Sequence, residues 1–299
     1  MSTTTHDVLI RPLRHDDVPL VERLSAEGFL ELDLRTHQRA WPDPQLRPAD
    51  RAASWIRRTH HLIGTDPGGC WAATRGDEIV GFATSFTREK MWILSSYVVR
   101  PGMQGQGIGT QLLAAALHHG RGCLRGMLAA SDDPLALRRY RLAGFELHAQ
   151  TSLHGRLDRS AIPVVEKVRE GSLGDRDLMD SIDRQTRGAA HGPDHDFLAG
   201  DFRLVVTERS TGSGYAYVDD HGAPVLLAAT SRRTAVDLMW EALASTPTGA
   251  TLEVGHITSA NHWAVDVGLA ARLSIHHRGY LMVRGMKPPT AYLHHGSLL

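Results

Sequence analysis

The chain has 299 residues, of which 42% are hydrophobic and 22% charged, and its 33 basic side chains are balanced by 33 acidic ones. This composition provides enough apolar material for two cores and excludes a chain that is disordered throughout. A net charge of zero argues against a general nucleic-acid or membrane-surface binder, because both need an excess of basic residues.

The compartment is indicated by what the sequence lacks. Cys70 and Cys123 are the only cysteines and have no paired spacing, which favours a reducing environment. Residues 1–11 have no apolar core of the length that a signal peptide needs, and no run approaches the roughly 18 apolar residues of a membrane span. We therefore expect a cytoplasmic protein with no membrane partner and no nucleic-acid partner.

Hydrophobic periodicity and turn residues predict alternating strands and helices in the first half of the chain. Strands are expected over residues 7–11, 70–74, 79–86, 91–99 and 124–130, and helices over residues 17–31, 48–60, 110–118 and 134–142. Residues 33–50 are rich in Pro, Arg and Asp and are expected to form an irregular loop.

The same order of elements returns in the second half. Arg11 and Asp17 recur as Arg169 and Asp175, six residues apart both times, and a helix pattern follows in each case. Strands are expected over residues 164–169, 215–218, 225–229, 251–254 and 280–284, and helices from residue 175, over 234–244 and over 260–267.

The repeat predicts an α/β (α+β) fold of two domains. We place the domains at residues 1–155 and 163–299, with a linker over 156–162. Each is expected to be a mixed, mostly antiparallel sheet flanked by helices.

The most informative segment is the loop that joins the strand over 91–99 to the following helix. It reads Gln104-Gly105-Gln106-Gly107-Ile108-Gly109-Thr110. Glycines let a backbone turn sharply and approach a ligand closely, and the N–H groups at a helix N-terminus favour an anion. The segment therefore predicts a pyrophosphate site, although a Gly-rich turn alone also fits a tight connection.

Two other phosphate-binding loops do not fit this segment. The dinucleotide fingerprint is G-x-G-x-x-G near the start of a parallel unit, whereas here the spacing is Gly105-x-Gly107-x-Gly109 after strands that look antiparallel. The Gly-Lys-Ser/Thr sequence of a P-loop is absent.

Two segments resemble the GNAT acetyltransferase superfamily. The stretch from Val99 and Pro101 through Gln104 to Gly109 matches the pattern V-x-P-x-x-Q/R-x-x-G-x-G/A. A second pattern, N-x-x-A-x-x-x-Y-x-x-x-G-F, is matched by Asp133-x-x-Ala136-x-x-x-Tyr140-x-x-x-Gly144-Phe145. The resemblance covers residues 7–155.

This resemblance implies that acetyl-CoA is the acyl donor. It assigns the pantetheine arm to the backbone of Tyr97, Val98 and Val99, and the pyrophosphate to Gln104, Gly105, Gln106, Gly107, Ile108, Gly109 and Thr110. Asp133 stands where an Asn commonly contacts the pantetheine, and this departure alters or weakens that contact.

Tyr140 matches the family's general acid, which protonates the thiolate of CoA as it leaves. A phenol with a pKa near 10 beside a thiol near 8.5 makes this proton transfer only mildly uphill. The alternative role for Tyr140 is that of a core aromatic at the end of a helix.

The sequence leaves more than one candidate for the general base that deprotonates the amine. Many family members use a carboxylate on the strand before the loop, but this strand offers Ser95 and Ser96 instead. We take Ser96 and Glu89, which precedes the strand, as the candidates. A further alternative is that the enzyme only positions the amine and water takes the proton.

The acceptor is expected near the first helix and the loop after it, where aromatic and acidic side chains suit a cationic amine. The candidates are Phe29, Glu31, Asp33, Trp41 and Trp55, although Trp41 and Trp55 fit packing equally well.

We therefore expect an N-acetyltransferase that acts on a small-molecule amine by direct transfer in a ternary complex. The alternative is a non-catalytic acyl-CoA-binding regulatory or interaction protein. The oligomeric state is open, with a homodimer among the candidates.

The second half lacks the catalytic motifs. Ala264 and Gly268-Leu269 stand where the first half has Tyr140 and Gly144-Phe145, and Arg232-Arg233 replace the glycine loop. Asp183, Gly188 and the region to Ala199 weakly resemble the C-terminal domains of tandem GNAT proteins. We expect no independent transfer chemistry there.

No metal site is expected. His191 and His195 are four residues apart, but Gly192-Pro193 between them argues against a zinc pair on one helix face. The histidine doublets elsewhere in the sequence have no ligand spacing.

Overall fold

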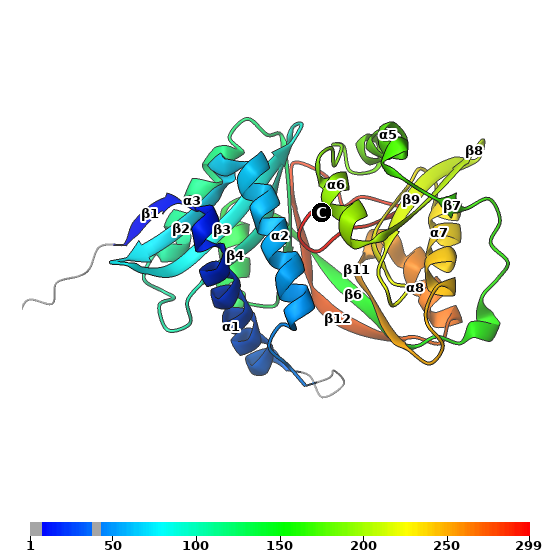
Figure 1. Ribbon diagram of the computed structural model, residues 1–299, viewed down its shortest axis with the longest axis horizontal. Helices are drawn as coiled ribbons and strands as arrows, with labels where there is room; N and C mark the ends of the chain where they lie inside the picture. The colour runs from blue at the N-terminus through cyan, green and yellow to red at the C-terminus, as the bar shows by residue number, and fades with distance from the viewer. Residues whose placement is uncertain (1–7, 38–42) are drawn as a thin grey trace, which may run out of the picture. The chain divides into compact units, whose positions relative to one another are not determined.

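The computed structural model describes residues 8–37 and 43–299, which divide into two compact units (Figure 1). The first unit runs to Thr87 and resumes over Trp92–Leu124, and the second comprises Arg88–Met91 and Arg125–Leu299. Within the described ranges, no helix combines the length and the apolar content that a membrane crossing requires.

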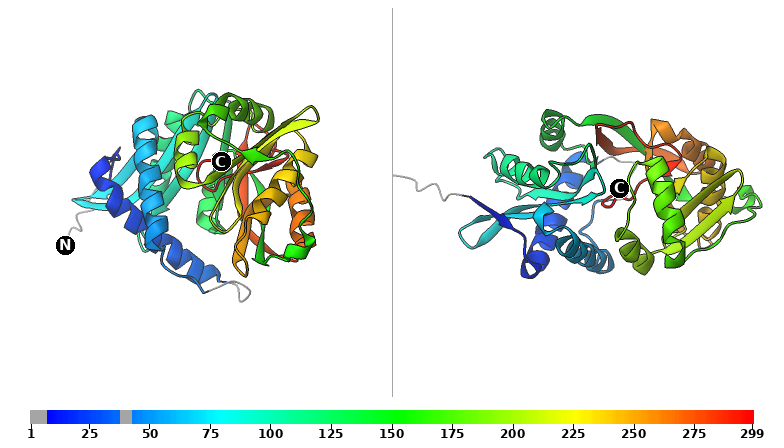
Figure 2. Two further views of the ribbon diagram at one scale, coloured as in Figure 1. Left: turned by 45° about the vertical axis from the view of Figure 1, so that its right-hand side comes forward. Right: turned by 90° about the horizontal axis from the view of Figure 1, so that it is seen from above.

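The first unit is built on four neighbouring strands with three helices. Their order is β1 (Leu9–Pro12), β2 (Cys70–Arg75), β3 (Glu78–Arg88) and β4 (Met91–Val99), with β1–β2 and β2–β3 antiparallel. Helices α1 (Val18–Thr36) and α2 (Ala49–Thr65) cover one face, and α3 (Ile108–His119) covers the other (Figures 1 and 2).

Side chains from each layer fix these helices on the sheet. Val18 and Val21 of α1 are fully buried, three residues apart on one helix face. On α2, the Trp55 ring packs edge-on against Phe82 of β3 with centroids 5.8 Å apart. On the other face, Trp92 Nε1 donates to the Ala116 carbonyl of α3 over 3.0 Å.

The second unit contains two sheets with five helices. One sheet has the antiparallel order β5 (Arg125–Ala130), β12 (Ser274–Arg284), β6 (Glu146–Arg156), β11 (Thr251–Thr258). The other has the order β13 (Tyr292–Leu293), β10 (Pro224–Ala229), β9 (Gly212–Val218), β8 (Arg203–Arg209), β7 (Arg169–Glu170). The helices are α4 (Pro134–Leu142), α5 (Arg176–Thr186), α6 (Asp194–Asp201), α7 (Arg232–Ala244) and α8 (His262–Ala270).

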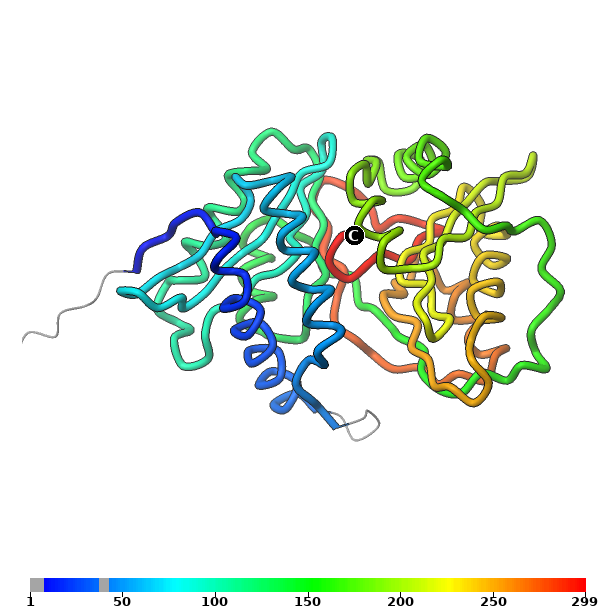
Figure 3. Tube along the Cα trace, viewed as in Figure 1, coloured from blue at the N-terminus to red at the C-terminus, as the bar shows by residue number. Residues whose placement is uncertain are grey.

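Strands of the two sequence halves alternate in the first of these sheets. The late strand β12 lies between β5 and β6, and β6 lies between β12 and β11, as the colours of the chain trace show (Figure 3). In the register, Leu281 of β12 pairs with Ala129 on one side and His148 on the other. Neither half therefore completes this sheet by itself.

The compact units are divided differently from the predicted domains because of this alternation. The limits 1–155, 156–162 and 163–299 describe the repeat in the sequence, and they stay a prediction. The α/β (α+β) fold class is confirmed.

The core of the second unit lies where α7 and α8 meet the strands. Leu153 of β6 is fully buried among side chains of both helices and of β11. A Cβ atom at Gly268 of α8 would lie 2.3 Å from Leu153 Cδ1, so a larger residue there would force Leu153 to move. Gly268 therefore has a packing role, whereas Leu269 is 51% exposed.

The predicted elements agree with the structure in their order, and the main differences are these. Residues 33–50 are not wholly irregular, because α1 continues to Thr36 and α2 begins at Ala49. Of the strand expected over 164–169, only Arg169 belongs to β7. Helix α6 was not predicted, because Gly192-Pro193 and the acidic residues after them are typical of a loop. Strands β8 and β13 were not predicted either.

A polar cluster is buried beside β6 and β11. Gln150 Nε2 donates to Nε2 of His294, which is 2% exposed, and the rings of His256 and His294 lie 4.3 Å apart. Burial lowers the pKa of His294 to about 4, and the pKa of His256 is also lowered by burial and by its neighbour His294. At neutral pH both imidazoles are therefore uncharged.

Acid should destabilise the fold through His294. Its pKa is lower in the folded chain than the 6.5 expected when unfolded, so protonation favours unfolding. The stabilisation is complete above pH 6.5 and is lost as the pH falls toward 4. At about 1.4 kcal/mol per pKa unit, it amounts to roughly 3 kcal/mol.

Urea unfolding measured between pH 7 and pH 4 checks this expectation. The wild-type chain should lose more unfolding free energy than His294→Gln, whereas His221→Gln, at an exposed position, should follow the wild type. Equal losses in all three chains would contradict the assignment.

Candidate functional site

The glycine loop between β4 and α3 has a left-handed backbone at three positions. The φ angles of Gly102, Gly105 and Gly107 are 78°, 79° and 84°. A non-glycine residue pays about 1–2 kcal/mol in this region. A Cβ at any of the three would meet no atom within 4 Å, so backbone conformation and not crowding requires glycine here.

The loop ends at a helix start that favours anions. Gly107 is the N-cap of α3, and the first intrahelical bond runs from Gln111 N to Gly107 O over 3.2 Å. The N–H groups of Ile108 and Gly109 precede that bond and point out of the helix start. Gly107 provides no side chain to cap them, so these donors suit an anionic ligand.

One side-chain hydrogen bond and one backbone hydrogen bond hold the two ends of the loop in place. Arg75 of β2 donates to Gln106 Oε1 over 2.8 Å. Arg100 N donates to the Val80 carbonyl over 2.9 Å, which keeps the end of β4 on β3. Gln104 lies exposed, with Nε2 3.5 Å from the Val99 carbonyl.

The predicted pantetheine strand is β4. Val98 is buried, whereas Tyr97 and Val99 are half-buried. Of the two serines, Ser96 is buried, and Ser95 Oγ has no hydrogen-bond partner among the described residues. Ser96 belongs to the first unit, as does the loop.

The second motif builds helix α4 in the second unit. Asp133 is the N-cap, and its Oδ1 accepts from Leu135 N over 2.9 Å. Tyr140 is 5% exposed, and its carbonyl accepts from Phe145 N over 3.0 Å after the left-handed turn at Gly144. The residues of the second motif thus also have structural roles: Asp133 begins the helix, Tyr140 anchors it in the core, and Gly144 follows its end.

Glu89 lies at the turn between β3 and β4 and is assigned to the second unit. Its Oε1 accepts from Arg184 Nε over 2.7 Å, and its Oε2 accepts from Ala190 N over 3.4 Å. The bond to Glu89 raises the pKa of Arg184. The Glu89 carboxylate is engaged within the second unit, whereas Ser96 belongs to the first unit.

The acceptor candidates differ in environment. Trp55 is 5% exposed and lies under the guanidinium groups of Arg47 and Arg58, which favours packing. Phe29, Glu31 and Asp33 lie on α1, with Phe29 40% exposed. Trp41 lies outside the described residues.

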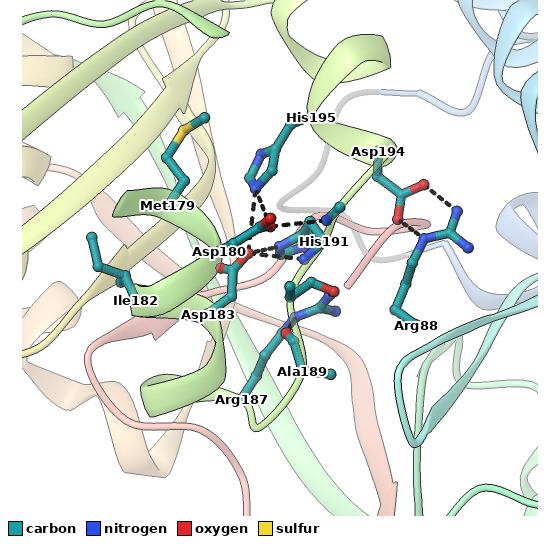
Figure 4. Close-up of polar contacts among 12 residues, drawn as sticks. Arg88, Met179, Asp180, Ile182, Asp183, Arg187, Ala189, His191, Asp194 and His195 are labelled. Atoms are coloured by element: carbon teal, nitrogen blue, oxygen red, sulfur yellow. Dashed lines mark hydrogen bonds and ion pairs between the residues drawn. The ribbon is translucent and has the colours of Figure 1, made fainter. Parts of the chain in front are cut away.

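The second unit holds a polar cluster that the sequence reasoning missed (Figure 4). It joins Asp183 of α5 to His191 and His195, with His191 Nδ1 2.7 Å from Asp183 Oδ2. Left-handed turns at Gly188 and Gly192 bring these residues together, and those two glycines were the available signal. Next to the cluster, Arg88 forms a buried ion pair with Asp194.

In the second half, the residues that stand in place of the motif residues have ordinary helical surroundings. Ala264 is buried in α8 and offers no hydroxyl. Arg232, at the start of α7, pairs with Asp266 over 3.1 Å, and both side chains are about 70% exposed.

Comparison with known proteins relates the first half of the chain to one family. Residues 27–145 match the model of the acetyltransferase (GNAT) family. The N-alpha-acetyltransferase RimI of Mycobacterium tuberculosis is 28% identical over 146 residues, which cover 49% of this chain and 83% of that protein.

Solved structures extend the likeness of fold to the whole chain. A putative acetyltransferase from Pyrococcus horikoshii aligns with a TM-score of 0.75 and 21% identity over 99% of this chain and 97% of that one. A GCN5-related N-acetyltransferase from Kribbella flavida aligns with a TM-score of 0.61 and 16% identity over 94% and 72%. At these identities the likeness concerns the fold alone.

The left-handed N-cap predicts a difference between two glycine substitutions. Gly107→Ala should lower the free energy of unfolding by about 1–2 kcal/mol, because alanine is strained there. Gly64→Ala, within α2 and with open space around it, should leave stability unchanged or raise it by about 0.5–1 kcal/mol. Urea unfolding followed by tryptophan fluorescence compares them, and equal effects would contradict the role of Gly107.

Proposed function

Residues 27–145 belong to the GNAT acetyltransferase family, and on this premise we propose that the chain is an acyltransferase that transfers the acetyl group of acetyl-CoA to the amine of a small molecule. The observation that carries the proposal is the loop after β4. Its left-handed glycines lead directly into the uncapped start of α3.

In this proposal the loop from Gln104 to Thr110 binds the pyrophosphate. The N–H groups of Ile108 and Gly109 donate to it, and the helix dipole adds favourable charge. The backbone of Tyr97, Val98 and Val99 bonds the pantetheine arm. Asp133 already caps α4 through Oδ1, so we assign it the role of fixing the start of α4.

The proposed reaction is direct transfer within a ternary complex. The amine nitrogen attacks the thioester carbonyl carbon, a tetrahedral intermediate forms, and the carbon–sulfur bond breaks. Tyr140 donates its phenolic proton to the departing thiolate and regains a proton from solvent. Holding both reactants in one site removes much of the entropic cost of the encounter.

The amine loses its proton to water in this scheme. Glu89 is held by Arg184, and protonating it would break that ion pair. We therefore assign Ser96 the role of a hydroxyl that orients the amine or a water molecule. The engaged Glu89, together with the lack of a carboxylate on β4, also favours the second candidate function, a non-catalytic acyl-CoA-binding protein.

The test is release of CoA thiol from acetyl-CoA across a panel of small amines. Release with one amine should fall by roughly 10²–10⁴ in Tyr140→Phe, because the general acid is lost. Tyr292→Phe is the control, since it removes a buried hydroxyl from the other sheet and should leave the rate unchanged.

Calorimetric binding of acetyl-CoA separates the two functions. Tight binding without thiol release from any amine would support the non-catalytic protein and a packing role for Tyr140. Release that persists in Tyr140→Phe would overturn the role of Tyr140 alone.

A further inference from the structure

Four side chains with metal-ligand chemistry meet between α5 and the start of α6 (Figure 4). Asp183, His191 and His195 each place one ligand atom within 4.8 Å of the others. Asp180, one turn before Asp183 on α5, joins them from the edge, with Oδ1 3.4 Å from His195 Nε2. All four belong to the second unit.

The distances around His195 match those between ligands that share a metal ion. Its Nε2 lies 3.4 Å from Asp180 Oδ1 and 3.4 Å from Asp183 Oδ2. In a tetrahedral zinc site, with bonds of about 2.0–2.2 Å, neighbouring ligand atoms are about 3.3–3.6 Å apart. One ion between these three atoms therefore needs little movement.

Burial makes this arrangement costly without a ligand. The side chains of Asp183, His191 and His195 are fully buried. Nε2 of His191 and Nε2 of His195 have no hydrogen-bond partner in the part of the chain that the structure describes. An unsatisfied buried polar atom costs about 1–3 kcal/mol, and a metal bond removes that cost for His195.

The surrounding groups hold the ligand atoms in orientation. Nδ1 of His195 lies 3.1 Å from the Tyr217 hydroxyl, which leaves Nε2 directed at the two carboxylates. Tyr215 donates its hydroxyl to Asp183 Oδ1 over 2.5 Å, and Gly192 N donates to Asp180 Oδ1 over 3.0 Å. Metal ligands in proteins are typically fixed by such outer hydrogen bonds.

Hydrogen bonds direct the guanidinium groups of two neighbouring arginines to other acceptors, although the charge of Arg187 also lowers the pKa of Asp183. Arg187 directs its guanidinium to the main-chain oxygens of Ala189, Ala190 and Leu299. Arg88 forms its bidentate ion pair with Asp194. The carboxylates of Asp180 and Asp183 both lie 3.4 Å from His195 Nε2, and a divalent cation at that point would bind to both of them directly.

We propose that His195, Asp183, Asp180 and His191 bind one zinc-class divalent metal ion that ties α5 to α6. The ligands are His195 Nε2, Asp183 Oδ2, Asp180 Oδ1 and His191 Nδ1. When the ion binds, the hydrogen bond from His191 Nδ1 to Asp183 Oδ2 is replaced, and the ring proton resides on Nε2. Imidazole and carboxylate donors without a thiolate select zinc or cobalt over copper(I).

Four protein ligands leave no open position, so the ion is structural and takes no part in the acyl transfer. The proposal is independent of the proposed function. It departs from the expectation drawn from the sequence, which considered only a pair on one helix. Gly192-Pro193 prevents that pair, but the turn it makes folds His191 back toward α5.

The test uses the full chain, dialysed against a chelator and then titrated with Zn²⁺ by calorimetry and with Co²⁺ by visible absorption. We expect one ion per chain, the absorption of tetrahedral Co²⁺, and a melting temperature that rises by several degrees at saturating Zn²⁺. These readouts do not depend on enzymatic activity.

Two ligand variants and one control complete the design. Asp180→Asn, at a half-buried position, keeps an oxygen that accepts from Gly192 N and should weaken zinc binding at least tenfold. His195→Gln should abolish the visible absorption of bound Co²⁺. His221→Gln, which is exposed, should bind as the wild type does. Absence of binding to the wild-type chain, or binding unchanged in Asp180→Asn, would overturn the proposal, whether or not His195→Gln folds.

Discussion

The pairing of β6 with β12 is the constraint on which the second unit depends. These two antiparallel strands come from opposite halves of the chain, and each completes a sheet edge that the other half leaves open. Edge strands expose unpaired backbone groups, and interleaving removes that exposure at β5 and β6. The packing of α8 on β6, with Gly268 against Leu153, adds side-chain contact to the same exchange.

The candidate chemistry depends on backbone geometry more than on reactive side chains. In the loop, glycine is required at Gly105 and Gly107 by the φ angle, and the ligand donors are main-chain N–H groups. In α4, the same residues that resemble a catalytic motif begin and end the helix, so Asp133 and Tyr140 have structural roles beside any chemical one. This is why the loop, and not a single side chain, carries the proposed function.

Local signals in the sequence predicted local structure well. Helix α4 has its expected limits because Asp133, Pro134 and Gly144 are strong cap residues. Pairing between distant segments has no such signal, so the place of β12 between β5 and β6 could not be predicted. The proximity of Asp183 and His195 could not be predicted for a related reason. A turn, and not the period of one helix, brings the two side chains together, and hydrophobic periodicity carries no information about turns. Strand pattern also failed at Val164–Val168, where apolar residues follow Pro163 without a partner strand.

The interleaved sheet has a consequence for synthesis in the cell. Translation adds about 5–20 residues per second and the N-terminal part of a chain ordinarily folds first. Here β5 and β6 are made early, but the strand that separates them ends at Arg284. The nascent chain must therefore keep two strand edges open while more than a hundred further residues are made, and a stalled or prematurely terminated product would expose them to other chains.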